Sequence, residues 1–448
     1  MMSSSFVERP RYTCALGGAM ATVTALPGAI PLLHTPGGCA GNITWTQNGA
    51  CGLQAGGYCG GLTVPSSNVE QKDVVFGGVD RLKEQIGNTL DVMEGELYFV
   101  LTGCVTEVIG DDVRGVVGEF QGKGVSLIFA ETGGFKGNSY YGYDQVLQSL
   151  FKNFVQQGVK KIKGRVNVWG IAPYLDVFWR GNLEGLRLVL EKVGLEVNTF
   201  FTAADSLEGI RQAASAELNI VVSDIYGVNA AAVFEEVHGT PYLTTSLPVG
   251  PAATDHFLRQ VEAALSLNHS QVEEIIAREN HVYYQYLEPL VDSYNDFDLQ
   301  RYSIVVGDGN YAPSITKYLA DDLGWLPELV VITDQLEDEL KERLASRFRG
   351  LESGLQPAVV YETDTSEIIS HFNRHWPRNK SQKYYNSFSP AFVVGSSLDR
   401  ELALALGAAH LSVSFPVANR AVLDRGYTGY RGGLHLAEDL LSAAVANR

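Results

Sequence analysis

Cysteine is scarce in this chain of 448 residues, and none of its five cysteines follows Cys104. The disulfide framework of a secreted protein would place paired cysteines throughout the sequence. An odd number confined to the N-terminal region argues against such a framework. It favours a reducing, cytoplasmic compartment with thiolates that bind metal or react.

Positive charge and long apolar runs are scarce as well. The chain has 34 Lys and Arg against 51 Asp and Glu, a net charge of −17, which argues against nucleic acid or an anionic membrane as a partner. No apolar run approaches the roughly 18 residues of a membrane-spanning helix. The stretch 15–33 follows Arg9 and Arg11 and superficially resembles a secretory signal, but we expect its glycines and prolines to break it. The expected turns are at Gly17, Gly18, Pro27, Gly28 and Pro31.

A recurring order of β-type run, Gly or Asp turn and amphipathic helix is what the sequence does have. Strands are predicted at 165–170, 195–200, 219–223, 241–246, 302–306, 328–333, 358–361 and 391–394. Continuous β-branched runs that alternate with helices are typical of parallel sheets buried on both faces. We therefore predict an α/β fold of three Rossmann-like subdomains around a central cleft, with parallel-rich sheets in residues 1–150, 151–300 and 301–448.

Ligands of such sheets bind beyond the carboxyl ends of the strands. Two turns stand out there: Gly103-Cys104 after the run 97–101, and Gly133-Gly134 after the run 126–130. Cys14 and Cys39 also lie in glycine-rich loops, where the backbone can approach a bulky ligand and donate N–H groups.

Two interpretations of these cysteines stay open at this point. A free cysteine is most often a small buried apolar side chain, whereas three in glycine-rich loops favour metal or iron–sulfur ligation. The wide spacing of Cys14, Cys39 and Cys104 lacks the short pairs of a structural zinc site. Three thiolates also fall short of the four ligands of an ordinary cubane cluster. A non-cysteine ligand or a second chain would have to complete such a site.

Several segments together resemble the nitrogenase component 1 superfamily. They are Cys14, His34-x-x-Gly37-Gly38-Cys39, Glu70-x-x-Asp73-x-Val75-Phe76-Gly77-Gly78 and Cys104-x-Thr106-Glu107-Val108-Ile109-Gly110-Asp111-Asp112. The later segments 133–139, 414–416 and 429–433 are similar to the family in the same order, the last two to the end of its β-type subunits. The resemblance implies a nitrogenase component 1 fold. It also implies that Cys14, Cys39 and Cys104 ligate half of a P-type 8Fe-7S cluster, with Gly38, Gly103 and Gly134 against it, and that an α-type partner binds the other half.

An absence points to the β type. The family's α-type subunit holds the active-site iron–sulfur cofactor through one cysteine and one histidine in its middle and C-terminal portions, and this chain has His435 there but no cysteine. The resemblance therefore implies an oxidoreductase subunit that relays electrons to a cofactor in the α-type partner. The expected assembly is an α2β2 heterotetramer served by a dimeric, ATP-dependent iron protein. This chain has no G-x-x-x-x-G-K-S/T loop, so ATP hydrolysis belongs to another protein.

Two departures from the family pattern bear on the reaction. Cys14 stands close to the start of the chain, where classical molybdenum nitrogenase β-subunits have a long extension, and Gly134 stands where they have a serine that can ligate the oxidised cluster. These departures favour a nitrogenase-like reductase, and methylthio-alkane reductase fits best on overall size and β-type character. A dinitrogen-reducing nitrogenase, a cofactor-assembly scaffold and a catalytically silent protein with buried thiols stay open. Cys51 and Cys59 have no family counterpart and are either non-ligands or extra, redox-responsive thiols.

Weaker patterns have simpler interpretations. The run 305–312 mimics a dinucleotide fingerprint, but Asp308 would repel a pyrophosphate, which favours a structural βα turn. His371 and His375 have the spacing of a zinc protease without its acidic residue, so we expect a solvated pair. Glu107, Asp111 and Asp112 either position loops near a cluster or stabilise a helix start.

Overall fold

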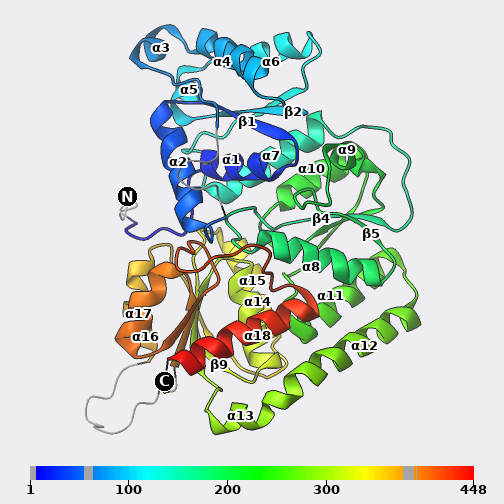
Figure 1. Cartoon of the computed structure of the whole chain (residues 1–448), viewed down its shortest axis with the longest axis vertical. Coiled ribbons are helices and arrows are strands. Elements are labelled where there is room, and N and C mark those ends of the chain that lie inside the picture. The colour runs from blue at the N-terminus through cyan, green and yellow to red at the C-terminus, as the bar shows by residue number, and fades with distance from the viewer. Residues whose placement is uncertain (1–6, 55–63, 377–387, 390, 448) are drawn as a thin grey trace.

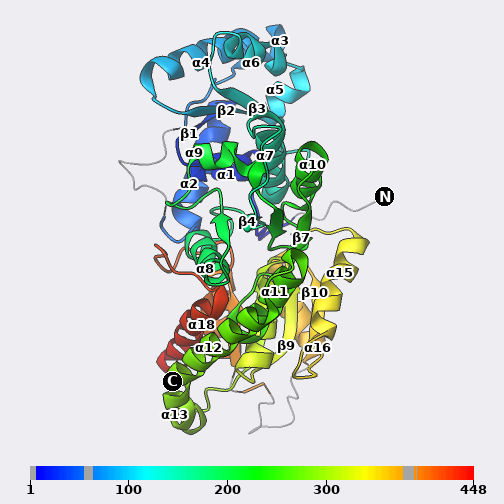
Figure 2. The same ribbon diagram turned by 90° about the vertical axis from the view of Figure 1, so that its right-hand side faces the viewer.

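The computed structural model describes residues 7–54, 64–376, 388–389 and 391–447 of the chain. The strands of these residues form three sheets that follow one another along the sequence, and every strand pair within them is parallel. Helices flank the sheets, and the three regions are stacked along the long axis of the molecule (Figure 1, Figure 2). The architecture confirms the predicted α/β fold. Among the described residues, no helix has the length and apolar character needed to cross a membrane.

The first sheet, of order β1-β2-β3, lies between two layers of helices. Its strands are β1 (Ala29–His34), β2 (Leu97–Thr102) and β3 (Leu127–Ala130). Its helices are α1 (Ala15–Ala25), α2 (Gly37–Ala50), α3 (Gln71–Phe76), α4 (Val79–Val92), α5 (Cys104–Ile109), α6 (Val113–Gln121) and α7 (Ser139–Asn153). His34 is paired with Thr102 and Leu101 with Ala130, so the three strands end at one edge of the sheet.

The second sheet has the order β5-β4-β6-β7, which is the flavodoxin-like arrangement of a doubly wound fold. Its strands are β4 (Arg165–Trp169), β5 (Glu196–Asn198), β6 (Leu218–Val221) and β7 (Tyr242–Thr244). The helices are α8 (Trp179–Lys192), α9 (Leu207–Arg211), α10 (Val228–His238), α11 (Gly250–Leu265), α12 (His269–Leu287) and α13 (Val291–Asp296), with short helical turns at Ala213–Ser215 and Glu288–Leu290.

The third sheet has the order β10-β9-β8-β11-β12, which is the order of a Rossmann fold. Its strands are β8 (Tyr302–Gly307), β9 (Leu326–Ile332), β10 (Ala358–Tyr361), β11 (Ala391–Gly395) and β12 (Ala409–Ser412). The helices are α14 (Tyr311–Lys317), α15 (Asp338–Arg349), α16 (Ile368–His375), α17 (Arg400–Leu406) and α18 (Gly429–Ala446), with short helical segments η3 (Tyr318–Asp322), η4 (Thr365–Glu367) and η5 (Ser397–Asp399).

The alternation of side chains along the strands explains how the core is divided. In β2, Phe99 and Leu101 join the large cluster that runs through the molecule, whereas Tyr98 and Val100 face a separate cluster with α4 and α6. In β8, Val305 joins the large cluster and Ile304 a third cluster behind the last sheet. Successive side chains of a strand point to opposite faces, so each sheet is buried on both.

The sheets lie within the predicted segments 1–150, 151–300 and 301–448, but helices connect them. The last helix, α18, packs against α8, α11 and α12 of the middle segment, and α7 packs against both α1 and α10. The segment boundaries therefore stay a prediction.

The turns expected at the N-terminus are partly wrong. Gly17 and Gly18 lie inside α1, and Pro31 lies inside β1. A Cβ at Gly18 would lie 1.8 Å from the carbonyl oxygen of Ser139, and one at Gly142 would lie 1.9 Å from that of Ala15. Glycine is needed here because α1 and α7 approach each other closely, and this packing outweighs the poor helix propensity of glycine.

Candidate metal centre

Two of the candidate ligands follow neighbouring strands of the first sheet. Cys104 begins α5 immediately after β2, and Cys39 lies in the first turn of α2 after β1. Because the two strands end in register, both cysteines leave the sheet at its carboxyl edge. A Cβ at Gly103 would lie 2.2 Å from Thr35 Oγ1, so glycine allows the two loops to meet.

Cys14 reaches this region from outside the sheet. It immediately precedes α1, and its backbone forms an antiparallel bridge with Asn138 in the loop after β3. The Ser139 N–H donates to the Thr13 carbonyl oxygen at 2.8 Å, which fixes the pairing. The position of Cys14 thus depends on a contact between segments far apart in the sequence.

Gly134 lies between Cys14 and Cys104. A Cβ at this position would lie 3.0 Å from Cys14 Cβ and 3.3 Å from Cys104 Sγ. The Gly134 N–H donates to Cys104 Sγ at 3.1 Å. The structure therefore brings Cys14 and Cys104 together around Gly134, with Cys39 on the adjoining loop, and all three cysteines are exposed. A Cβ at Gly38, beside Cys39, would meet no atom within 4 Å, so this glycine borders open space.

Glu107 holds the loop that carries Gly134. Its Oε1 accepts the Gly133 N–H at 2.6 Å and the Thr102 hydroxyl at 2.5 Å, and its Oε2 lies 2.8 Å from Lys136 Nζ. Asp112, in contrast, accepts the Gly115 N–H at the start of α6. Asp112 therefore stabilises the start of a helix, whereas Glu107 connects α5 to the loop that carries Gly134.

His34 supports the loop that carries Cys39. Its side chain is fully buried, with Nδ1 2.9 Å from Ser67 Oγ and Nε2 2.9 Å from Asp111 Oδ2. Burial lowers the pKa of His34, and the hydrogen bond that its ring donates to Asp111 only partly offsets this. The imidazole is neutral at pH 7, and both ring nitrogens are engaged, so neither is free to ligate a metal.

Cys51 lies apart from the other described cysteines. It is buried in the large core, and its backbone pairs with Val417 near the end of the chain. Burial raises the pKa of the thiol far above its usual value, which keeps it protonated. Cys51 therefore has the environment of an apolar core residue, and Cys59 lies outside the described residues.

The weaker sequence patterns have structural roles. Asp308 Oδ1 accepts the N–H groups of Asn310 and Tyr311, so this carboxylate stabilises the turn before α14 where a dinucleotide phosphate would sit. His371 Nε2 lies 3.0 Å from Glu362 Oε2. His435 Nδ1 lies 3.2 Å from the carbonyl oxygen of Gly426.

Some residues that hold the centre carried no signal in the sequence. Ser67 braces His34, and Arg11 forms a buried ion pair with Asp399. Both contacts join residues far apart along the chain. No local pattern identifies such pairs, because only the folded chain brings them together.

Exposed cysteines are suited to soft metals. Thiolate sulfur is a preferred ligand of iron–sulfur clusters, and backbone N–H groups directed at sulfur stabilise its charge. Cys14, Cys39 and Cys104 therefore have the residue type and the exposure that such a cluster requires.

Comparison with known proteins identifies the family. The model of the nitrogenase component 1 type oxidoreductases matches residues 14–444. The β chain of a vanadium-iron nitrogenase from Trichormus variabilis is 23% identical over 98% of this chain and 94% of its own length. The iron-molybdenum cofactor biosynthesis protein NifE of Methanosarcina barkeri is 29% identical, over 52% of this chain and 51% of its own length.

A solved structure supports the fold. The structure described as nitrogenase Cp1 at pH 6.5 superposes with a TM-score of 0.80 at 16% identity, covering 100% of this chain and 95% of that chain. The chain belongs to the nitrogenase component 1 family of oxidoreductases. Within this family, whose members bind iron–sulfur clusters, it is similar to the β-type subunits along nearly its whole length.

Proposed function

We propose that this chain is the β-type subunit of a two-component, nitrogenase-like reductase. In this proposal Cys14, Cys39 and Cys104 hold half of a P-type 8Fe-7S cluster at the interface with an α-type partner. The observation that carries the proposal is the convergence of Cys14 and Cys104 around Gly134, at the edge to which Cys39 also belongs. When bound, such a cluster accepts and passes on electrons.

The chain's own groups suit this role. The Gly134 N–H donates to Cys104 Sγ, which stabilises negative charge on the sulfur. Glu107 and Lys136 fix the same loop through a 2.8 Å ion pair. Gly38 leaves space beside Cys39.

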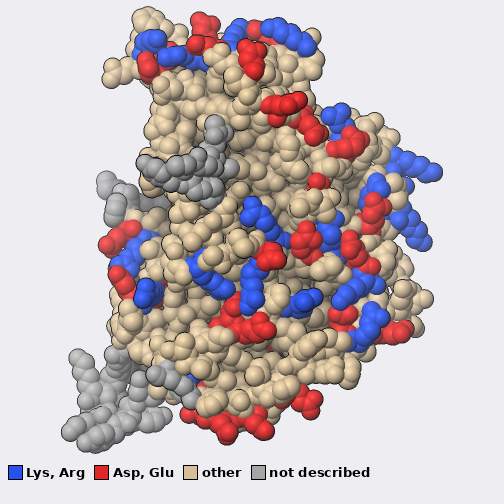
Figure 3. All heavy atoms as spheres, in the orientation of Figure 1, with Lys and Arg blue, Asp and Glu red and all other residues tan. Residues whose placement is uncertain are grey.

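The surroundings of the cysteines have the character of an interface. Helix α2 contains no charged residue, and it exposes Trp45 to 73%. Phe76, Val108 and Phe135 are exposed on α3, on α5 and in the glycine loop. On the face seen in Figure 3, charged side chains of both signs are frequent over the middle and lower elements. Exposed apolar surface of this kind marks an interaction site, and the α-type partner that completes the cluster is its expected occupant.

The reaction itself is assigned to the partner. No cysteine follows Cys104 in the sequence, so the active-site cofactor would be held by the α-type subunit in an α2β2 assembly that a dimeric, ATP-dependent iron protein reduces. We propose reductive C–S cleavage of methylthio-alkanes, in which two electrons and two protons convert CH3–S–R to methane and HS–R. The glycine at position 134, where molybdenum nitrogenases have a serine ligand, supports a reductase other than molybdenum nitrogenase.

A second candidate is a cofactor-assembly scaffold, because cofactor biosynthesis proteins named NifE also match, one over 52% of this chain and another over 97%. Dinitrogen reduction is a further alternative, favoured by the nitrogenase β chains that match nearly the whole chain.

The first experiment addresses the cluster. The complex with its α-type partner is purified anaerobically, and iron and acid-labile sulfide are measured for the wild type, Cys39→Ala and Cys104→Ala, with Cys51→Ala as the control from the core. We expect both candidate-ligand variants to lose most of their cluster and Cys51→Ala to keep it. Full iron content in Cys39→Ala and Cys104→Ala would refute the ligand assignment.

The second experiment addresses the reaction. The loaded complex is supplied with iron protein, ATP, a reductant and either a methylthio compound or dinitrogen. Methane without ammonia supports the proposal, ammonia supports a nitrogenase, and the absence of turnover in a loaded complex supports a scaffold.

A further inference from the structure

The segment before Cys14 is attached to the opposite end of the chain. Residues 7–13 run between α2 and α17 in Figure 1, and they contact loops that follow strands of the third sheet. The N–H groups of Glu8 and Arg9 donate to Asp364 at 2.9 and 3.3 Å. The Arg9 side chain lies 3.0 Å from Glu401.

Arg11 makes the strongest of these attachments. Its Nη2 lies 2.6 Å from Asp399 Oδ1, and the side chains of the pair are only 3% and 2% exposed. Arg11 Nε donates to Thr365 Oγ1 at 3.0 Å, and this hydroxyl donates in turn to the Arg9 carbonyl oxygen. Asp399 is itself fixed, because its Oδ2 accepts the Ser396 N–H at 2.7 Å. A buried, hydrogen-bonded ion pair of this kind tolerates little displacement.

The three candidate ligands are therefore positioned by different parts of the molecule. Cys39 and Cys104 follow β1 and β2, whose hydrogen bonds hold them in register. Cys14 is held on one side by the loop after β3, where Ala15 N–H donates to the Gly137 carbonyl oxygen at 3.1 Å. On its other side the chain leads directly to Arg11, which is locked to the third sheet region.

We propose that Arg11 is a positioning residue for Cys14, which it holds in place relative to Cys39 and Cys104 through its ion pair with Asp399. The inference rests on the proposed cluster function and extends it, because it makes the C-terminal region a determinant of cluster binding. It also separates the ligands into two groups, so that loss of the attachment affects Cys14 first.

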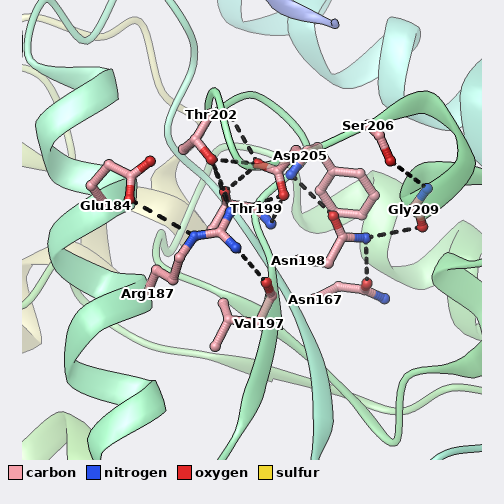
Figure 4. A network of polar contacts seen from close by, with 11 residues as sticks. Asn167, Glu184, Arg187, Val197, Asn198, Thr199, Thr202, Asp205, Ser206 and Gly209 are labelled. Atoms are coloured by element: carbon pink, nitrogen blue, oxygen red, sulfur yellow. Dashed lines mark hydrogen bonds and ion pairs between the residues drawn. The ribbon is translucent and has the colours of Figure 1, made fainter.

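A matched control is available in the middle of the chain. Arg187 forms a comparable ion pair, with Nη2 2.9 Å from Asp205 Oδ1 and further hydrogen bonds to the hydroxyls of Thr199 and Thr202 (Figure 4). This pair joins α8 to the loop after β5, on the side of the molecule opposite α2 and α5 (Figure 1). Replacing Arg187 measures how much stability the protein loses when an arginine of this kind is removed away from the cysteines.

The experiment compares Arg11→Met, Arg11→Lys and Arg187→Met in the anaerobically purified complex. Unfolding in urea measures stability, the rate of iron loss to a chelator measures cluster retention, and EPR of the oxidised cluster reports its environment. We expect iron loss from Arg11→Met to be about tenfold faster, the usual lower size for the loss of a group that orients a metal ligand. We also expect an altered EPR spectrum and partial recovery of both properties in Arg11→Lys. Arg187→Met should lose stability without changing either property.

The outcomes separate the inference from the proposed function. The inference alone would be overturned if the wild-type complex holds iron and Arg11→Met has the same rate of iron loss and the same EPR spectrum as Arg187→Met. A wild-type complex without iron would overturn the proposed function and the inference with it. If Arg11→Met does not fold, Asp399→Asn replaces it, because it removes the charge and keeps a hydrogen-bonding group, and the same criteria apply.

Discussion

His34 Nε2 lies 2.9 Å from Asp111 Oδ2, and both side chains are almost completely buried. The other oxygen of Asp111 accepts the Gly78 N–H at 2.8 Å. One carboxylate therefore connects the loop that leads to Cys39, the turn between α3 and α4, and the turn between α5 and α6. These segments carry the family resemblance, and this contact explains how they act as one unit.

Replacement of Asp111 by asparagine should loosen this unit. The amide has one acceptor oxygen in place of two, so either the His34 ring or the Gly78 N–H loses its partner. A buried group left without a hydrogen bond costs about 1–3 kcal/mol, and the free energy of unfolding in urea should fall by that amount. Asp112→Asn on the same turn is the control, since it alters only an exposed helix cap and should cost about 1 kcal/mol or less. Equal losses in the two variants would contradict the role given to Asp111.

The protonation of His34 should make stability depend on pH. Burial lowers the pKa of His34 from 6.5, so below that pH the unfolded chain binds more protons than the folded chain. The contribution of His34 to the free energy of unfolding is therefore present above about pH 6.5. It is lost as the pH falls toward the lower pKa that His34 has in the folded state. His34→Gln removes the titrating group, so the difference in unfolding free energy between wild type and variant should shrink on going from about pH 7.5 to about pH 5.5. A difference that stays constant over this range would exclude His34 as a source of the acid sensitivity.

Gly134→Ala should disturb the cluster site without breaking the fold. The new methyl group would lie 3.0 Å from Cys14 Cβ and 3.3 Å from Cys104 Sγ, so at least one cysteine has to move. We expect iron to be retained about tenfold less well in a chelator competition. Gly118→Ala in α6 provides the comparison, because its Cβ meets nothing within 4 Å and the change should be neutral or stabilising. Unchanged iron retention in Gly134→Ala would mean that the glycine is not needed beside the sulfurs.

The exposed apolar residues near the cysteines should contribute to partner binding. Phe76 is 88% exposed at the end of α3, and burial of such an aromatic residue in an interface is worth about 2 kcal/mol, or about a 30-fold change in Kd. Phe76→Ser should weaken the complex by that factor in sedimentation or surface-binding measurements. Val92→Ser is the matched control, since Val92 is 80% exposed at the end of α4, near the start of β2 at the other edge of the sheet. Equal affinity of the two variants would place the interface elsewhere.

Much of the fold could be predicted from local patterns. The β-branched runs at 302–306 and 391–394 correspond to β8 and β11, because strands buried on both faces need apolar side chains at every position. The shorter strand β12 was not predicted. The helix α1 was not predicted either, because its glycines favour turns locally. It forms because α7 packs closely against it.

For the candidate site as well, some features follow from the sequence and others only from tertiary contacts. Cysteine at positions 14, 39 and 104, glycine beside each of the last two, and the absence of cysteine thereafter are properties of the sequence alone. They predicted thiolate ligands, because thiolate chemistry belongs to the residues themselves, and the motifs around them resemble the family that the comparison identifies. Only the tertiary structure decided that Gly134 lies between Cys14 and Cys104, and that Arg11 is joined to Asp399. The first contact forms because the loops of the first sheet converge, and the second because the third sheet region packs against the N-terminal segment; both link residues far apart in the chain.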